Sequence, residues 1–289
     1  MEQNLILLIL VYKGLTSCWG EHTIELGGDS MGRKKKDRLG EFFYSKDDLG
    51  GYKYIIIEYN HANDVIVEFQ DTYKAKVKTT YQHCKSGGIK NPYHPTAYGR
   101  GYIGVGSYSS RDENGNKTKC YSSWRNIFIR CYDETRLDMF PTYKGCSVNE
   151  EVYDFQKFGE WFDVNYYEVE GEKMCLDKDI LKKGNKEYSF DTMVFVPERI
   201  NILFTKSNSV RGEYPIGVTY HKLTNKYCSH LSTMDGNKWL GLFDTVEQAF
   251  EVYKKAKEDY IKEIADEYKD RIPHKLYVAM YNWVVEMDD

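Results

Sequence analysis

Two stretches of the chain carry side chains whose types and spacing could support chemistry. The first is the motif Cys-Leu-Asp-Lys-Asp-Ile-Leu at 175–181, which Asn201 follows in a short predicted helix. Carboxylate and amide oxygens are the ligands that Mg²⁺ and Mn²⁺ take in proteins. Asp177 with Asp179 or Asn201 is therefore a candidate metal site. The alternative is that both carboxylates are solvated turn residues without a ligand.

The second stretch has polar and apolar residues alternating in three short runs, at 216–221, 226–232 and 238–243. The Asp235-Gly236 pair before the third run is a strong hairpin signal, so the runs predict an antiparallel sheet. Because side chains of a strand point alternately to its two faces, one face of this sheet is apolar. That face consists of Val218, Tyr220, Tyr227, Leu231, Leu240 and Leu242. The other face consists of Thr219, His221, Cys228, His230, Ser232, Asn237 and Trp239.

One long helix is predicted directly after these strands. Asp244 and Thr245 precede Glu247 and Gln248, which is the chemistry of a capping box at a helix start. Apolar residues then follow at helical spacing as far as Tyr268. A helix laid over the apolar face of the sheet leaves the polar face open, and that open face includes a large aromatic side chain.

This three-strand and helix pattern resembles the AP-two/ERF DNA-binding domain of plant transcription factors and of some phage homing endonucleases. The match spans 214–268 and rests on Gly217-Val218, Trp239-Leu240-Gly241, Phe243-Asp244-Thr245 and the series Ala249, Tyr253 and Ala256. In that family the free sheet face lies in the major groove. The resemblance places DNA contacts on Thr219, His221, His230, Ser232, Asn237 and Trp239.

The free face departs from the family in one respect. The family uses several arginines there and this chain has none, which argues against a guanine-rich target because arginine reads guanine bidentately. The alternative to DNA binding is a small structural module whose Trp239 packs on a neighbouring domain.

The middle of the chain resembles the degenerate His-Asn-His (HNH) nuclease domains of phage. The resemblance rests on the order of a W-x-x-x-x-x-R-C helix at 124–131, an F-x-x-F-x-x-W helix at 155–161 and an L-D-K-D hairpin at 176–179. It implies a fold in which a hairpin carries a metal ligand beside a general base and a helix supplies the last ligand.

The HNH resemblance assigns catalytic roles residue by residue. Asp177 falls on the metal-ligand position, Lys178 replaces the histidine base, Thr192 replaces an asparagine that fixes the loop, and Asn201 takes the last ligand position. A lysine activates water near pH 7 only if its pKa falls by several units. We therefore expect efficient cleavage to be lost and the fold to persist as a DNA-binding scaffold, with a metal-dependent nuclease as the alternative.

The N-terminal part is predicted to contain a small β-rich module at 31–106. Alternating runs predict two strands there, and the segment resembles modules that precede phage HNH nuclease-like proteins. Basic residues that include Lys90 and Arg100 are mixed with tyrosines, which indicates either a DNA-binding surface or a solvated loop face. Residues 1–30 differ in composition from the rest, and we interpret Met31 as the natural start of translation.

Composition limits the function classes. The net charge of −4 argues against tight non-specific binding to nucleic acid, although 31–108 holds 13 basic against 8 acidic residues. Seven cysteines without a Cys-x-x-Cys pair indicate a reducing compartment, which we expect to be the cytoplasm of a bacterial host. No run of apolar residues reaches the length of a membrane span, so we expect no membrane partner.

The expected architecture is α+β. It comprises an extension at 1–30, the β-rich module at 31–106, an HNH-like α/β domain at 119–206 and a three-stranded antiparallel sheet packed by one long helix at 212–289. The expected function is sequence-specific binding of double-stranded DNA by a protein of phage or mobile-element origin, with Mg²⁺ or Mn²⁺ as cofactor if the nuclease is active. A non-enzymatic DNA-binding regulator and a protein-binding inhibitor module remain alternatives.

Overall fold

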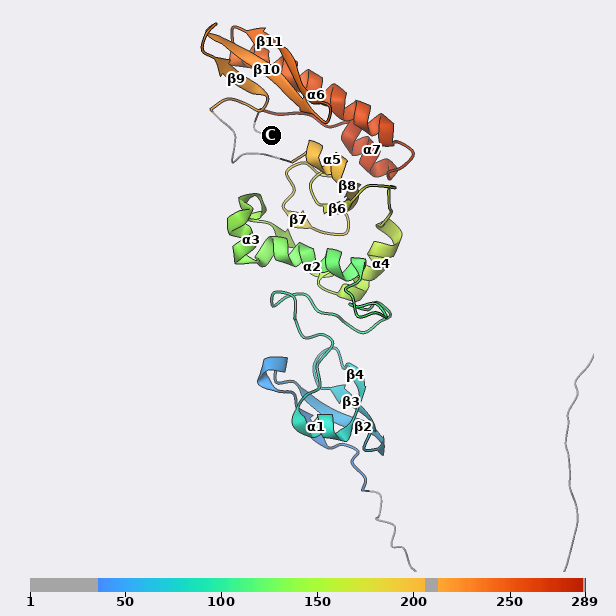
Figure 1. Cartoon of the computed structure of the whole chain (residues 1–289). Coiled ribbons are helices and arrows are strands. Elements are labelled where there is room, and N and C mark those ends of the chain that lie inside the picture. Colours follow the sequence, from blue (N-terminus) through green and yellow to red (C-terminus); the bar gives the residue numbers. More distant parts are fainter. Residues whose placement is uncertain (1–35, 206–212, 288) are drawn as a thin grey trace, which may run out of the picture. The chain divides into compact units, whose positions relative to one another are not determined.

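A computed structural model describes residues 36–205, 213–287 and 289 and confirms the α+β class (Figure 1). The predicted extension at 1–30 and the predicted start at Met31 lie outside the described residues. Among the helices that the structure describes, none has the length and apolar character needed to cross a membrane.

The N-terminal module is a four-stranded antiparallel sheet in the order β1-β2-β3-β4, two strands more than the alternation predicted. Its core alternates along β2 and β3, where Tyr54, Ile56, Val65 and Val67 are buried. The elements are β1 (Phe42–Tyr44), the 3₁₀ turn η1 (Asp47–Leu49), β2 (Lys53–His61), β3 (Asp64–Phe69), β4 (Lys76–Thr79) and α1 (Tyr81–Ser86).

The middle segment contains both helices that the aromatic spacing predicted. Trp124 and Phe155, one on each helix, are fully buried with their rings 5.4 Å apart, and the Trp124 indole N–H donates to the carbonyl of Val152 at 2.7 Å. The elements are α2 (Lys119–Tyr132), α3 (Glu134–Met139), η2 (Pro141–Tyr143), β5 (Ser147–Val148), η3 (Glu150–Val152), α4 (Phe155–Asn165), β6 (Met174–Asp177), β7 (Glu187–Tyr188), β8 (Val194–Pro197) and α5 (Glu198–Leu203).

A β-β-α unit lies within this segment. β6 pairs antiparallel with β8, and α5 begins at the residue after β8 ends. The register places Asp177 opposite Val194, so the loop between the two strands starts at the predicted metal ligand. β6, β8 and α5 thus follow one another as strand, strand and helix around this loop.

The segment at 97–108 packs onto the middle segment. Ala97 belongs to the core around α2 and α4, and the Tyr108 hydroxyl donates to Asp163 at 2.6 Å. The amide of Gln156 donates to the carbonyls of Ile103 and Tyr108 at 2.9 and 3.1 Å. The end of the predicted β-rich module is therefore part of the packing of the middle segment.

The C-terminal sheet and helix have the predicted form, with strand order β11-β10-β9 and α6 lying along one face (Figure 1). Thr245 caps α6 as its position predicted, because its hydroxyl accepts the backbone N–H of Gln248 at 3.2 Å. The elements are β9 (Val218–His221), β10 (Lys226–Thr233), β11 (Gly236–Phe243), α6 (Val246–Tyr268) and α7 (His274–Tyr281).

A bulge in β11 changes the predicted faces of that strand. Ser229 pairs with Gly241 and His230 with Trp239, so Leu240 is the extra residue. Beyond the bulge, Leu242 pairs with Cys228 of the polar face. The prediction that Leu242 lies on the covered face was wrong, because strict alternation fails at an inserted residue.

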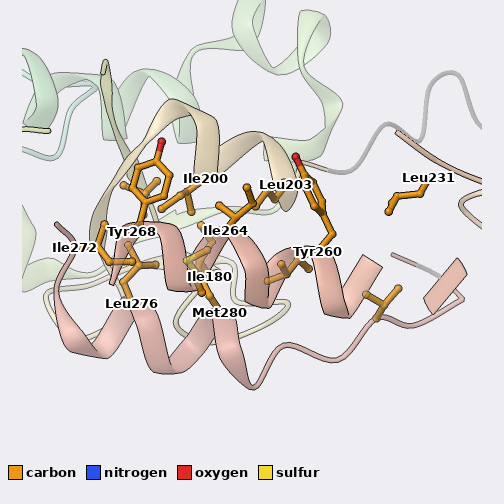
Figure 2. Packing of buried hydrophobic residues seen from close by; sticks show 14 of the residues in the cluster. Ile180, Ile200, Leu203, Leu231, Tyr260, Ile264, Tyr268, Ile272, Leu276 and Met280 are labelled. Carbon is orange, nitrogen blue, oxygen red and sulfur yellow. The ribbon is translucent and has the colours of Figure 1, made fainter. Parts of the chain in front are cut away.

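The largest core joins the β-β-α unit to the C-terminal helices (Figure 2). Ile200 of α5 and Ile180 of the preceding loop pack in one cluster with Ile264 of α6 and Leu276 of α7. α6 contacts the sheet from Ala249 as far as Tyr260, whose hydroxyl accepts the backbone N–H of Met234 at 3.2 Å. Its last turns place Ile264 in the same cluster as Ile200 of α5. The segments on either side of 206–212 are thus held by one hydrophobic core.

This shared core predicts the effect of a substitution in α5. Ile200→Ala should lower the free energy of unfolding by about 2–5 kcal/mol, because Ile200 is fully buried and its loss leaves a cavity. Ile202→Ala is the matched control, since Ile202 is 59% exposed on the same helix and its loss should change stability by about 0.5 kcal/mol or less. Urea unfolding measures both, and equal losses would contradict the shared core.

Candidate functional site

The predicted catalytic and metal-binding residues line one cavity of about 280 Å³. Asp177, Lys178 and Asp179 lie where β6 ends, and Asn201 lies on α5. Other residues of α2, of η2, of the β6–β8 loop and of the C-terminal segment complete its wall. These include Arg130, Tyr143, Lys183, Lys186, Tyr188 and Trp283.

Asp177 begins a tight turn. Its Oδ1 accepts the backbone N–H groups of Asp179 at 2.7 Å and of Ile180 at 2.8 Å, which fixes the carboxyl group against the loop. Burial raises the pKa of Asp177 to about 6, and the negative charge of Asp179 adds to the rise, although both backbone bonds favour the ionised form. The loop therefore fixes the position of the Asp177 carboxyl group, while burial and the charge of Asp179 disfavour its ionised form.

Lys178 is buried, and its Nζ lies 3.1 Å from Oδ2 of Asp179. Burial acts to lower the pKa of Lys178, but the charge of Asp179 and other neighbouring groups outweigh burial and hold the pKa above its usual range. The ammonium also lies 5.8 Å from the ring centroid of Tyr188. A lysine in this setting stays protonated near neutral pH and cannot act as a general base there.

Two side chains hold the loop between β6 and β8. The Thr192 hydroxyl donates to the carbonyl of Glu187 at 3.0 Å and lies 2.9 Å from the hydroxyl of Ser189. Asn185 spans the loop, because its amide donates to the carbonyls of Lys178 at 2.8 Å and of Glu187 at 2.6 Å. Asn185 was not predicted as a site residue, because an asparagine directly after a glycine is typical of a turn.

Three basic residues of the cavity were not predicted as site residues. Arg130 donates to the carbonyl of Leu176 at 2.8 Å, and Lys186 donates to the carbonyl of Thr142 at 3.2 Å. Lys183 forms ion pairs with the C-terminal segment, at 2.6 Å to Asp289 and 2.8 Å to Glu286. The only sequence signal was the W-x-x-x-x-x-R-C motif, whose arginine is Arg130.

The donor set of the cavity fits a hard divalent cation. Within the described ranges no group of three or more His, Cys, Asp or Glu side chains is gathered for a metal. Two carboxylates and the Asn201 amide line the cavity, and Mg²⁺ is usually held by one or two carboxylates together with water and substrate phosphate. The repulsion between Asp177 and Asp179 is the kind of strain that a bound cation relieves.

The six predicted DNA contacts lie on one face of the C-terminal sheet. His230 pairs with Trp239 and Ser232 with Asn237 across β10 and β11, while Thr219 and His221 alternate along β9. The Ser232 hydroxyl donates to Oδ1 of Asn237 at 2.6 Å. This surface, which we call the polar sheet face, is opposite the face that α6 covers.

Trp239 is the largest side chain of the polar sheet face and is 68% exposed. Its indole N–H donates to Sγ of Cys228 on the neighbouring strand at 3.1 Å. The ring therefore lies across the sheet surface, and no described residue buries it.

A second cavity of about 590 Å³ borders the polar sheet face. Thr219, His230 and Ser232 line it together with Lys257 of α6. Burial lowers the pKa of Lys257. This cavity links the edge of the polar sheet face to the helix, and the sequence pattern did not indicate it.

The two predicted DNA contacts outside the C-terminal sheet lie in loops. Lys90 is exposed after α1. Arg100 places its guanidinium 4.6 Å from the ring centroid of Tyr132, and its Nη1 lies 3.4 Å from the Tyr153 hydroxyl. Arg100 therefore belongs to the surface of the middle segment.

The comparison with known proteins yields no relatives. No protein-family model, no curated protein and no solved structure matches the chain. The assignment of function therefore rests on the geometry of the cavity and of the polar sheet face.

The raised pKa of Asp177 predicts a pH-dependent stability. Its folded-state pKa of about 6 lies above the ordinary value of 3.8, so the unfolded chain loses this proton first as the pH rises. The contribution of Asp177 to the free energy of unfolding should therefore fall between about pH 4 and pH 6 and stay level above pH 6. Asp177→Asn keeps an oxygen for both backbone bonds and removes the charge. It should be more stable than the parent at pH 7, by at most about 3 kcal/mol, and similar to it at pH 4.

Urea unfolding at a series of pH values measures this difference. The control is Asp191→Asn, which removes an exposed carboxylate of the same loop and should not reproduce the pH dependence. An Asp177→Asn protein whose stability parallels that of the parent from pH 4 to pH 7 would contradict the prediction.

Proposed function

We propose that this protein binds double-stranded DNA, with the polar sheet face as the reading surface and the cavity of the β-β-α unit as a phosphate-binding site. The observation that carries the proposal is that Asp177, Lys178, Asp179 and Asn201 line one cavity together with further basic side chains. Their placement at a hairpin end and on the following helix supports the HNH resemblance. The phage or mobile-element origin is part of the same proposal.

The chemistry of the polar sheet face supports base reading. A β-sheet can lie in the major groove, where base edges present donors, acceptors and the thymine methyl group. Hydroxyl, imidazole and amide groups of Thr219, His230 and Asn237 match that pattern, and Asn is suited to adenine. With no arginine on this face, the proposed target is not rich in guanine.

The charge distribution supports modest affinity. The chain carries a net charge of −4, and the six proposed contact residues of the polar sheet face include no lysine or arginine. Lys226 lies at its edge, opposite His221, and is paired with Asp244 at 2.9 Å. We therefore propose that the protein contacts few phosphates and that its affinity depends weakly on salt.

DNA cleavage is a second candidate function, because the oxygen donors of the cavity fit Mg²⁺ or Mn²⁺. A bound cation would polarise a phosphodiester oxygen and lower the pKa of a bound water. Asp177, Asp179 and Asn201 would hold it. Lys178 stays protonated and so serves as a charge beside the phosphate, and the base required for fast hydrolysis is missing at that position. A non-enzymatic regulator is thus the form of the proposal that the cavity favours.

The exposed tryptophan provides a test of DNA binding. Trp239→Ala should weaken binding to a duplex target by roughly 30-fold, as expected for loss of about 2 kcal/mol from a central aromatic contact. The free energy of unfolding should change by only about 0.5 kcal/mol, because the ring is not buried. Fluorescence anisotropy on a duplex selected from a random library, together with urea unfolding, measures both.

Tyr281→Ala is the matched control, since Tyr281 is an exposed aromatic of α7 outside the sheet. It should leave duplex affinity unchanged. If the parent protein binds no duplex, DNA binding is refuted, and the protein-binding inhibitor is the function class that remains. Unchanged affinity in Trp239→Ala would exclude the polar sheet face as the reading surface.

A plasmid-nicking assay with Mg²⁺ or Mn²⁺ tests the second function. Any nicking should require the metal and be lost in Asp177→Ala, because Asp177 is the best-placed carboxylate at the end of β6. Asp191→Ala, at an exposed position in the same loop, should nick like the parent. Nicking by Asp177→Ala at the parent's rate would show that the site is wrongly assigned. No nicking by any of the proteins, with duplex binding retained, supports the regulator.

A further inference from the structure

Arg130 is a largely buried cation at the wall of the β-β-α cavity. It lies in the last turns of α2, and its Nη1 donates to the carbonyl of Leu176 at 2.8 Å and lies 3.4 Å from the Tyr188 hydroxyl. The ring centroid of Tyr143 is 5.6 Å from its guanidinium carbon. These contacts fix the orientation of the guanidinium group.

Arg130 forms no ion pair with a carboxylate within the described residues. The charge of Asp177 acts on it only from beyond ion-pair distance. A guanidinium has five N–H donors, and both hydrogen bonds described for Arg130 start from Nη1. Buried charges are ordinarily paired, because an unpaired charge is costly to remove from water. The remaining donors are therefore suited to an anion from outside the chain.

The other cations of the cavity are engaged differently. Lys178 is paired with Asp179, and Lys183 is paired with Asp289 and Glu286. Lys186 is exposed and donates to a backbone carbonyl. Arg130 is thus a partly buried cation of this cavity whose charge no described carboxylate neutralises by contact.

We propose that Arg130 is the phosphate ligand of the cavity and that it receives a phosphodiester of the DNA backbone. The proposal deepens the proposed function and rests on it for the source of the phosphate. The planar fork of a guanidinium matches two oxygens of a phosphate, which a lysine ammonium cannot do. No sequence signal other than the W-x-x-x-x-x-R-C motif pointed to this residue.

The hydrogen bond to Leu176 gives Arg130 its relation to the predicted metal ligand. Leu176 directly precedes Asp177 in β6, so the same strand end positions both the guanidinium and the carboxyl group. A phosphate held by Arg130 would lie beside the oxygen donors of Asp177 in the same cavity. Tyr188 acts on the phosphate only through Arg130 and is a positioning residue.

The test uses two ligands and two variants of the full chain. Inorganic phosphate is added at constant ionic strength, with chloride as the control anion, and binding is followed by the rise in melting temperature and by ³¹P NMR line width. A short duplex is titrated by fluorescence anisotropy. Arg130→Lys keeps the charge and removes the fork, and Tyr188→Phe removes only the hydroxyl that orients Arg130.

Arg130→Lys should abolish most of the phosphate-induced rise in melting temperature and weaken duplex binding by about tenfold, which is about 1.4 kcal/mol. Tyr188→Phe should reduce the phosphate-induced rise in melting temperature and the duplex affinity less than Arg130→Lys does. Lys255→Gln is the control, because Lys255 is exposed on α6. Its substitution should alter neither the phosphate-induced rise in melting temperature nor the duplex affinity. If Arg130→Lys fails to fold, Tyr188→Phe decides the outcome by the same two readouts.

The outcomes separate the ligand from its source. Unchanged phosphate and duplex binding in both variants would overturn the proposal. Loss of phosphate binding with unchanged duplex affinity would overturn the assignment to the DNA backbone and leave a site for free phosphate. A parent protein that binds phosphate through Arg130 but binds no duplex would refute the proposed function and support Arg130 as a phosphate ligand.

Discussion

The hydrophobic core shared by α5, α6 and α7 is the interaction on which the arrangement of the C-terminal half depends (Figure 2). The long helix α6 has more apolar surface than a three-stranded sheet can cover. Its first turns cover the sheet through Ala249 and Phe250, and its last turns pack Ile264 and Tyr268 against the β-β-α unit. Burial of these side chains holds the polar sheet face and the cavity on one body, because apolar burial is the dominant favourable term in folding. Removing α6 would expose apolar surface both on the sheet and on the β-β-α unit.

The cavity shows how positioning interactions also determine reactivity. Asp177 is held by two backbone N–H groups, and Lys178 by the carboxylate of Asp179. The ion pair that keeps Lys178 in place also keeps it protonated, so the cavity has a positive charge beside Asp177. The arrangement therefore favours binding of an anion over activation of water. A cavity with this charge is in this way compatible with the proposed DNA-binding role, which needs no cleavage.

In the proposed function, the two candidate surfaces would divide the task of DNA recognition between them. Phosphate contacts position a protein on DNA, whereas contacts with base edges provide sequence selectivity. The polar sheet face has hydrogen-bonding groups and an exposed aromatic but little charge. Arg130 and Lys186 give the cavity positive charge, and neither forms an ion pair with a carboxylate of the described residues. An acidic chain can bind DNA when its few cations are placed where phosphates lie. The acidic residues Glu286 and Asp289 lie at Lys183 and offset part of that charge.

Local pattern by itself determined the α+β class, the two aromatic helices of the middle segment, the three strands of the C-terminal sheet, and the capping of α6 by Thr245. These features follow from side-chain periodicity and capping, which act over a few residues. The same periodicity grouped Trp239 with His230 and Asn237 on one face, and the HNH resemblance selected Asp177, Lys178 and Asn201. Only the tertiary structure decided the bulge at Leu240, the shared core, and the contacts of Arg130, Asn185 and Lys183 around the cavity. Those features depend on residues far apart in the chain, and no local periodicity encodes which distant side chains will meet once the core is buried.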